Sequence, residues 1–509
     1  MNGKKEEKKA RLRKLWDQYV DESDYKKAKI MLKKFKELEA EVGPLEEESL
    51  ELWDHQKAAL KNWEDNGYKG IIEMATATGK TYVGIKGIER FCNHLEDKLH
   101  KKKARVIISC NSLDILYQWG LEIENKLELG EIISETYEGN MIIRSESNFK
   151  LMIDFITLQK ISMDFEKLPE NEFNKRYFCD FLIVDEVHHA AAPKHRRAFQ
   201  IPHEAAMGLS ATIEGKQRYN ILKDILGKKV FTYGIKDAID DGIIPRFTIK
   251  EKQAYLTPSE YSRYKWETKN ILKIFDYIKT YDNKSSILSL LRKKDYAVPK
   301  KIVHIGDFIT CMSVARYHGL KDRIPKRWFR LHRQILNRRR ILHDARNKEK
   351  LAIKIAKKVA HGKKCLLYHM TIESCERIAS ILDDDGINSW VLHSQLSKGT
   401  RRENLKSFKR AGKGILIAPK VLDEGIDIPD AEIGINVANY TTKLQLVQRM
   451  GRILRKKKGK NPVFYQLFCT VDKATKNVVR QVKSGLEYEI RQFRNNVKIF
   501  GDHVSIVRN

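Results

Sequence analysis

The stretch Ile71–Thr81, which reads IIEMATATGKT, has the residue types of a phosphate-binding loop. A short apolar run gives way to small residues, so a buried strand leads into a tight turn whose main-chain N–H groups can surround phosphate oxygens. Lys80 can reach the terminal phosphates and Thr81 offers a hydroxyl to Mg²⁺. The helix that begins there directs its positive dipole end toward the anion. The small residues of the turn are Ala75, Thr76, Ala77, Thr78 and Gly79.

The motif is incomplete, because Met74 stands where the full template has a glycine. An ordinary strand-to-helix turn is therefore the alternative, and the downstream sequence decides between the two. The next informative stretch is FLIVDEVHH at 181–189, in which four apolar residues read as a strand buried on both faces. Two carboxylates stand at its carboxyl end, where open α/β sheets bind ligands.

These carboxylates have distinct expected roles. Asp185 would hold the Mg²⁺ that Thr81 also serves, and Glu186 would orient or deprotonate an attacking water. A capped loop with solvated acids is the alternative. Four nearby histidines could suggest a metal site, but their spacing fits no common zinc pattern; they are His188, His189, His195 and His203.

Two weaker signals flank this pair of motifs. Gln56 lies in the amphipathic segment 52–63, and its amide can pair with a donor and an acceptor on adenine. Ser210 and Thr212, in the stretch GLSAT, could couple the nucleotide site to a neighbouring surface. Each also has a plain interpretation, as a surface glutamine and an ordinary loop.

The remaining chain divides into two α/β halves. Apolar strands at 104–110 and 150–159 alternate with helical patterns, and a second such rhythm begins near residue 363. That alternation predicts parallel sheets covered on both faces by helices. Near the end, the stretch QLVQRMGRILR at 445–455 places Gln448, Arg452 and Arg455 on one face of a helix. Two guanidiniums on one face suit an oxyanion that develops charge, although a surface stripe is the alternative.

The segment 250–350 lacks apolar strand runs and reads as basic helices. Between Arg316 and Lys350 there are thirteen basic residues and three acids. Aromatic residues lie within this basic run, which suits a surface that follows a nucleic-acid backbone and stacks on its bases. A solvated helical face is the alternative, and the sequence does not favour either. The candidate contacts are Trp328, Arg338, Arg339 and Arg340.

Composition sets outer limits. Lys and Arg number 97 against 67 acidic residues, a net charge of +30 that favours a polyanionic partner. The seven cysteines form no C-x-x-C pair, which predicts neither disulfides nor a zinc knuckle. No long apolar run or signal peptide is apparent, so we expect a soluble, cytoplasmic protein without a membrane partner.

Taken together, these stretches resemble the motifs of superfamily 2 helicases over roughly residues 52–468. DEVHH and QRMGRILR look most like the XPB-like and type III restriction-subunit branch of DExH translocases. The resemblance implies two tandem RecA-like domains. Apolar residues at helical spacing in 1–42 predict a helical N-terminal extension, and the basic helices of 250–350 would form an insertion between the lobes, where XPB-like proteins carry a thumb-like element. The expected ranges are 1–48 for the extension, 49–249 for the first domain, 250–350 for the insertion, 351–475 for the second domain and 476–509 for a C-terminal tail.

The resemblance also implies how the residues share the work on ATP and Mg²⁺. The expected catalytic residues are Lys80, Asp185, Glu186, Arg452 and Arg455. The expected nucleotide-binding residues are Gln56, Ala75, Thr76, Ala77, Thr78, Gly79, Lys80, Thr81, Gly425, Asp427 and Gln448. Thr81 and Asp185 would hold the metal, and His188, Ser210 and Thr212 would couple the site to the second domain, His188 through Gln448.

Three departures from the family pattern stand out. Ala77 replaces the usual glycine and Cys110 the frequent proline, while the sequence IEGKQ after GLSAT lacks the Arg-Glu-Asp triplet of XPB. The last difference leaves XPB-type strand separation in question. The overall prediction is an ATP-dependent DNA helicase or double-strand DNA translocase of repair, recombination or defence. An RNA helicase, the motor subunit of a restriction complex with a partner nuclease chain, and an inactive nucleic-acid-binding scaffold are the alternatives.

Overall fold

The computed structural model describes most of the chain after residue 50. The described residues are Lys34, Glu37, 51–129, 131–137, 140–146, 149–192, 195, 199, 201–213, 215–282, 286–293, 298–317, 319–419, 431–438, 443–454, 461–471 and 480–508. The helices predicted for 1–48 thus lie almost wholly outside the described part.

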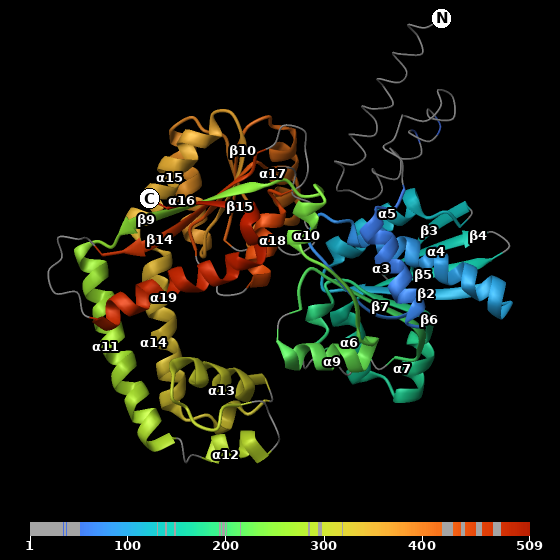
Figure 1. The fold of residues 1–509 in the computed structure, drawn as a ribbon, viewed down its shortest axis with the longest axis horizontal. Helices are drawn as coiled ribbons and strands as arrows, with labels where there is room; N and C mark the ends of the chain where they lie inside the picture. Colours follow the sequence, from blue (N-terminus) through green and yellow to red (C-terminus); the bar gives the residue numbers. More distant parts are fainter. Residues whose placement is uncertain are drawn as a thin grey trace, which may run out of the picture.

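The first domain is built on an eight-stranded sheet, seen at the right of Figure 1. Its strands lie in the order β3-β4-β5-β2-β6-β7-β1-β8, and all neighbours are parallel except the pairs that β4 makes. The strands are β1 (Lys69–Met74), β2 (Lys103–Cys110), β3 (Glu131–Tyr137), β4 (Asn140–Glu146), β5 (Lys150–Thr157), β6 (Cys179–Val184), β7 (His203–Ser210) and β8 (Lys229–Tyr233).

Helices cover both faces of this sheet, as the uninterrupted apolar strands predicted. One face packs under α3 (Asp54–Asp65), α4 (Lys80–Leu99) and α5 (Leu113–Lys126). The other face packs on α6 (Leu158–Lys167), α7 (Glu170–Tyr177) and α9 (Lys216–Leu226). Burial on two sides explains why β6 carries the run Phe-Leu-Ile-Val, whose side chains are all inaccessible to solvent.

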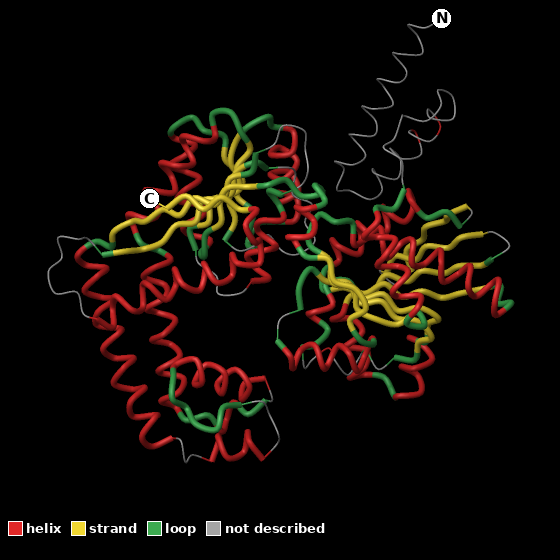
Figure 2. The backbone as a smooth tube through the Cα atoms, viewed as in Figure 1, coloured by secondary structure: helices red, strands yellow, loops and turns green. Residues whose placement is uncertain are grey.

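The second domain has a seven-stranded, wholly parallel sheet in the order β11-β12-β10-β13-β14-β9-β15. Figure 2 shows the two sheets as separate groups of strands. The strands are β9 (Phe247–Tyr255), β10 (Lys364–Tyr368), β11 (Ser389–Val391), β12 (Gly414–Ala418), β13 (Ile433–Asn436), β14 (Val463–Thr470) and β15 (Val504–Arg508). The helices are α15 (Arg346–Ala360), α16 (Ile372–Asp384), α17 (Lys398–Arg410), α18 (Lys443–Gly451) and α19 (Arg480–Val497). The predicted pair of α/β domains is confirmed.

The predicted domain boundaries are wrong at two places. Strand β9 pairs with β14 and β15 in the second sheet, so the second domain begins before Phe247 and not after residue 350. The basic helices are therefore an insertion within the second domain, not a segment between the domains. Residues 480–508 are no loose tail either, because α19 packs on β14 and β15 pairs with β9 at the sheet edge.

The insertion is a long helical hairpin capped by shorter helices (Figure 1). Helices α11 (Pro258–Tyr281) and α14 (Lys326–His343) lie side by side, and α12 (Ser286–Lys293), α13 (Ile305–Tyr317) and the turn η3 (Lys321–Arg323) close the far end. It has its own apolar core, which includes Ile271, Phe308 and Trp328. A separate core allows the insertion to keep its shape while the domains move.

The linker between the domains also has structure. Helix α10 (Ile235–Asp240) packs against the turn η4 (Lys498–His503), with an ion pair between Asp240 and His503 at 3.0 Å. Within the described residues, no helix is long and apolar enough to cross a membrane.

Candidate nucleotide site and interdomain contact

The phosphate-binding loop connects β1 to α4 as predicted. Gly79 has a φ of 80°, and a Cβ at this position would lie 2.3 Å from Nε2 of Gln56, so both backbone and space require glycine. Ala77 has a φ of 66°, in the left-handed region that favours glycine. Its methyl group therefore adds strain on the order of 1 kcal/mol to the loop.

Side chains of α3 hold the loop from outside. Nε2 of Gln56 donates to the carbonyl of Thr78 at 3.1 Å, and Oε1 of the same amide accepts from the backbone N–H of Trp53 at 3.0 Å. The ring of His55 also contacts the Thr78 carbonyl at 3.1 Å and stacks on Tyr233 with ring centroids 4.1 Å apart. Gln56 thus lies beside the loop, where its predicted role in adenine recognition stays a prediction.

Sequence reasoning missed His55 and Tyr233, because no motif marks them. Tyr233 ends β8, and its carbonyl accepts from the N–H of Ala75 at 2.8 Å. Burial lowers the pKa of His55, which favours the neutral ring in this stack. The only signal in the sequence is that an aromatic ring, His55, directly precedes Gln56 in the helix that contacts the loop.

Lys80 lies at the mouth of the loop. Its ammonium donates to the carbonyl oxygens of Met74 at 3.2 Å and Ala75 at 3.4 Å. Thr78 closes the turn by donating its hydroxyl to the Ala75 carbonyl at 2.7 Å. The N–H groups at the start of the twenty-residue helix α4 face the same turn, so donors and positive charge converge where a phosphate would bind.

Asp185 and Glu186 follow β6 on the same sheet edge as the loop. Asp185 is only 7% exposed; one carboxylate oxygen accepts from Nε1 of Trp119 at 2.9 Å and the other from the Glu186 N–H at 2.8 Å. Trp119 on α5 is a residue that the sequence analysis did not assign to the site. This hydrogen bond holds the Asp185 carboxylate in one orientation, as the hydrogen-bond partner of a metal-ligating carboxylate does.

His188 links this acidic pair to the GLSAT stretch. Its Nδ1 lies 3.1 Å from the Ser210 hydroxyl and 3.4 Å from a Glu186 carboxylate oxygen. Ser210 in turn donates to the Thr212 carbonyl at 3.2 Å. The three predicted coupling residues therefore form one connected group on the first domain. Glu186 has a φ of 45°, a strained conformation of the kind found at functional sites.

The second domain touches the phosphate-binding loop directly. A Cβ placed on Gly451, at the end of α18, would lie 2.1 Å from Oγ1 and 2.7 Å from Cβ of Thr76. Position 451 therefore has no room for a side chain larger than the hydrogen atom of glycine. Arg452 follows it directly in the sequence. One contiguous cluster of buried apolar residues also runs from the first domain into the second.

Not every predicted residue of the second domain can be placed. Arg455, Gly425 and Asp427 lie outside the described residues, as does the side chain of Gln448. Arg449 was not predicted, yet it anchors α18: it is 1% exposed, lies over the Tyr368 ring at 4.8 Å and hydrogen-bonds to Oδ1 of Asn436. Nδ2 of Asn436 in turn donates a hydrogen bond to Oε1 of Gln466 at 2.7 Å.

The prediction that Trp328 contacts nucleic acid is wrong. Its side chain is fully buried in the core of the insertion, and its Nε1 donates to Asp282 at 2.7 Å. Of the predicted arginines, Arg338 lies over the Tyr264 ring at 5.6 Å, and Arg340 forms an exposed ion pair with Asp344 at 3.7 Å. Both remain partly or fully accessible, and their role in binding stays a prediction.

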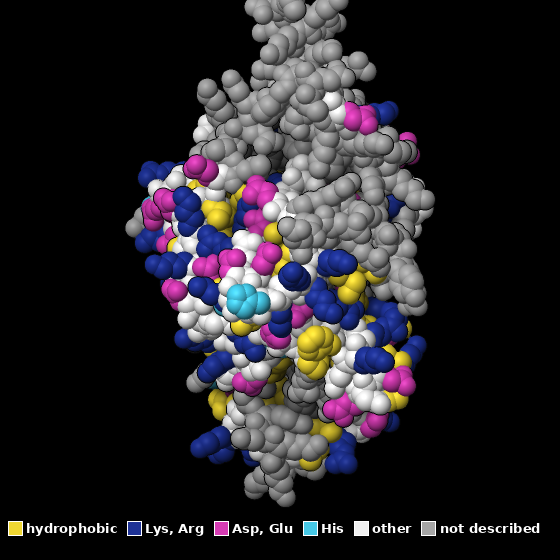
Figure 3. Space-filling model, turned by 90° about the vertical axis from the view of Figure 1, so that its right-hand side faces the viewer, with side chains coloured by type: hydrophobic (Ala, Val, Ile, Leu, Met, Phe, Trp, Pro, Cys, Tyr) yellow, Lys and Arg dark blue, Asp and Glu magenta, His cyan; other side chains and the backbone are white. Residues whose placement is uncertain are grey.

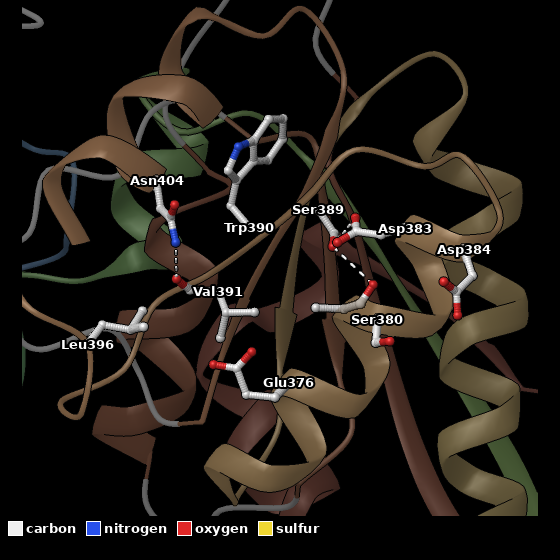
Figure 4. A pocket seen from close by; sticks show the side chains of 10 residues that line it. Glu376, Ser380, Asp383, Asp384, Ser389, Trp390, Val391, Leu396 and Asn404 are labelled. Atoms are coloured by element: carbon white, nitrogen blue, oxygen red, sulfur yellow. Dashed lines mark hydrogen bonds between the residues drawn. The ribbon is translucent and has the colours of Figure 1, made fainter. Parts of the chain in front are cut away.

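A separate cavity of about 390 Å³ opens at the β11 edge of the second sheet. Figure 4 shows Glu376, Asp383 and Trp390 among its lining side chains, which come from α16 and β11. His393 contacts Glu376 at 2.5 Å. None of the predicted nucleotide-site residues lines this cavity. In the described part of the chain, no group of three or more His, Cys, Asp or Glu side chains could hold a metal ion.

Known proteins share both domains. Residues 49–215 match the family model of the type III restriction enzyme res subunit, and residues 347–457 match the helicase conserved C-terminal domain. The DNA 3'-5' translocase XPB2 of Sulfurisphaera tokodaii is 25% identical over 420 residues, which cover 81% of this chain and 81% of that protein. The ATP-dependent RNA helicase DBP3 of Meyerozyma guilliermondii is 28% identical over 159 residues, 30% of this chain and 29% of that protein.

A solved structure has the same fold. The ATP-dependent type ISP restriction-modification enzyme LlaBIII bound to DNA superposes with a TM-score of 0.54 at 15% identity, covering 90% of this chain and 31% of that one. The chain is therefore a motor of the helicase class, an ATP-hydrolysing, nucleic-acid-dependent enzyme with two RecA-like domains. Its first domain matches the restriction-subunit family model, and most of its length aligns with an XPB-like translocase.

Proposed function

We propose that this protein is an ATP-driven DNA translocase whose domains close on the nucleotide at the contact between Thr76 and Gly451. That contact carries the proposal, because it brings α18 of the second domain against the phosphate-binding loop of the first. The named relative that aligns over most of the chain is a DNA translocase, whereas the RNA helicase aligns over 30% of it. DNA is therefore favoured over RNA.

The chemistry of the residues fits ATP with Mg²⁺. The loop offers main-chain N–H groups and Lys80 to phosphates, and Thr81 and Asp185 supply the oxygen ligands that Mg²⁺ prefers. Bound ATP·Mg²⁺ supplies the phosphoryl group that is transferred and the metal that neutralises its charge. Glu186 orients the attacking water, and His188 relays the state of that carboxylate to Ser210.

The arginines of α18 are supplied by the other domain. Arg452 follows Gly451, so closure of the domains brings its guanidinium to the transferring phosphoryl group, and Arg455 is proposed to join it. Related arginines raise phosphoryl-transfer rates by about 10³–10⁵. Because this stabilisation exists only in the closed state, binding favours closure and hydrolysis releases it. Each cycle then moves one domain along the nucleic acid.

An ATPase assay tests the proposal. ATP hydrolysis by the full chain is measured alone and with double-stranded DNA, single-stranded DNA or RNA of equal length. We expect strong stimulation by DNA, loss of hydrolysis in Lys80→Ala and retained DNA binding by that variant. Lys98→Ala, a change in the last turn of the same helix, is the matched control and should keep its activity. Absence of stimulation by all three nucleic acids would refute the proposal.

A restriction or defence context is the second candidate, because the model that matches residues 49–215 describes a restriction-enzyme subunit. Such a motor works with a nuclease, which would be supplied by a partner chain. Affinity purification from the native host with nuclease assays on the eluate distinguishes this case from a repair translocase that acts alone.

A further inference from the structure

Helix α11 of the insertion carries exposed aromatic rings that lie outside the apolar core of the insertion. Trp266 is 60% exposed, Tyr277 49% and Tyr281 63%. Trp266 and Tyr281 are the two most exposed aromatic side chains in the described part of the chain. The core of the insertion is instead formed by Ile271 and other residues on the opposite side of α11, so the exposed rings are not part of that core.

These rings lie in one row with two lysines. Positions Trp266, Lys269, Lys273, Tyr277 and Tyr281 follow at intervals of three and four residues, which places them on one face of the helix. We name this row the α11 face. At 1.5 Å per residue it is about 22 Å long. The rings of Tyr277 and Tyr281 lie with centroids 4.5 Å apart.

The carboxylates of α11 occupy positions outside this row. Glu260 caps the helix start and accepts from the N–H groups of Thr257 and Arg346. Glu267 is 8% exposed, and Asp276 forms an ion pair with Lys279 at 2.8 Å. The only charged side chains of the row itself are therefore the two lysines, Lys269 and Lys273.

Charge identifies the kind of ligand. Helices α11 and α14 together contain twelve Lys and Arg residues against three acids. The guanidinium of Arg327 on α14 also lies over the Tyr277 ring at 5.4 Å, beside the row. By contrast, Figure 3 shows a side of the molecule on which basic and acidic side chains are interspersed. The hairpin therefore attracts a polyanion.

The aromatic rings indicate that this polyanion is a single strand of nucleic acid. Exposed rings bind unpaired bases by stacking, and the lysines between them bind phosphates by charge. A duplex hides the faces of its bases from such rings. An acidic protein segment would use the lysines but has no repeated ring to place on three aromatic faces. A single nucleic-acid strand uses both.

We propose that the α11 face is a binding site for a single strand of nucleic acid, separate from the strand that the two domains move along. The proposal rests on the proposed motor function and deepens it. In Figure 1, α14 lies between α11 and the first domain. The α11 face is opposite the side of α11 that carries Ile271 into the core, so a strand on it runs along the outer side of the insertion. Such a site would hold a strand that has already left the motor or has not yet entered it.

The test measures binding by the full chain without ATP, using a labelled 20-nucleotide oligothymidylate and a 20-base-pair duplex as separate probes. The double variant Trp266→Ala, Tyr281→Ala should bind the single strand at least tenfold more weakly, because each stacked base contributes about tenfold or more. Its affinity for the duplex should stay within twofold. Phe178→Ala removes a ring that is 47% exposed on the first domain and serves as the matched control.

Two further variants separate stacking from charge. Trp266→Phe keeps a ring, so it should retain single-strand affinity while losing part of the quenching of tryptophan fluorescence on binding. Lys269→Ala, Lys273→Ala should reduce the slope of log K against log salt by about 1.4, the value for two phosphates of a single strand.

Unchanged single-strand affinity in the Trp266 and Tyr281 variant would overturn the inference, as would an equal loss for the duplex. Displacement of the oligonucleotide by polyglutamate at equal charge concentration would also overturn it and assign the face to an acidic protein. These readouts need no ATP hydrolysis. A chain that binds the strand through α11 but shows no stimulated ATPase would refute the proposed function and leave only the single-strand binding site on α11 standing.

Discussion

His369 follows β10 as a fully buried residue, and it links the stability of the second domain to pH. Burial, together with the nearby cations Lys348, Arg377 and Arg449, lowers the pKa of His369 to about 3. Its Nδ1 accepts from the backbone N–H of Thr371 at 3.5 Å, an interaction that protonation would remove. The folded domain therefore holds this ring neutral.

The sign of the effect follows from proton binding. Because the folded pKa lies below the unfolded value of 6.5, the unfolded chain binds the extra proton, and the free energy of unfolding falls as pH drops from 6.5 toward 3. His369→Gln should remove a slope of about 1.4 kcal/mol per pH unit in this window. Urea unfolding followed by circular dichroism at pH 5, 6 and 7 measures it. The exposed His361→Gln is the control, and an unchanged slope in the His369 variant would contradict the assignment.

The positions of individual candidate residues at a strand end or a strand-to-helix turn were predictable where chemistry dictates type and spacing. Lys80 and Asp185 are such cases, because phosphate and Mg²⁺ accept few substitutes. His55 and Trp119 were not predictable, since their roles depend on contacts with distant segments of the chain. The error at Trp328 arose from reading its basic neighbours instead of its helical phase with Leu331 and Ile335, which places it in the core.

At the scale of elements, the contact of α18 with the phosphate-binding loop gives a stringent test of closure. Gly451→Ala should lower DNA-stimulated ATPase roughly tenfold or more, because overpacking against Thr76 costs about 1–3 kcal/mol. Alanine is better than glycine in a helix by about 1 kcal/mol, so the second domain itself should not lose stability. The kcat of stimulated hydrolysis and the melting temperature are the two measurements.

A second-site change provides the control. Thr76→Gly in the Gly451→Ala background removes the clashing atoms and should restore much of the rate, whereas Thr76→Ser keeps Oγ1 and Cβ and should not. Equal rescue by both changes would show that the loss arises elsewhere.

The sequence analysis did not predict strand β9, because buried and more exposed side chains alternate along it. Its residues Phe247, Ile249 and Glu251 are buried while those between are half-exposed, a pattern unlike the continuous apolar runs of β6 and β12. Uninterrupted apolar runs are typical of central strands that are covered on both faces. Strand β9 lacks such a run because it lies next to the sheet edge, beside β15. The Glu251 carboxylate is buried by its pair with Arg494 of α19, at 3.0 Å between Nε and Oε1.

For the whole molecule, the corrected boundaries predict the effect of truncation. Removing residues 476–509 deletes α19 and β15, and with them the apolar contacts of Phe493 and Phe500. Burying a phenylalanine side chain contributes about 1.5–3 kcal/mol, so this loss should unfold the second domain or make it protease-sensitive. Limited trypsin digestion compares the truncated chain with one that lacks residues 1–48. A second domain that resists trypsin without residues 476–509 would contradict the assignment.

The insertion has a further consequence for the whole molecule. Both of its ends join the second domain, at β9 and at α15, so it moves with that domain when the motor closes. A strand bound on the α11 face would then be displaced together with the second domain during each cycle.

The position of β15 also decides when the protein can finish folding during synthesis. Its partner β9 is made more than 240 residues earlier in the chain. Until β15 leaves the ribosome, one hydrogen-bonding edge of β9 stays open to pairing with other chains, as exposed strand edges generally do. Slow translation or stalling before β15 is made would therefore favour aggregation of a chain whose candidate nucleotide-site residues have all been made.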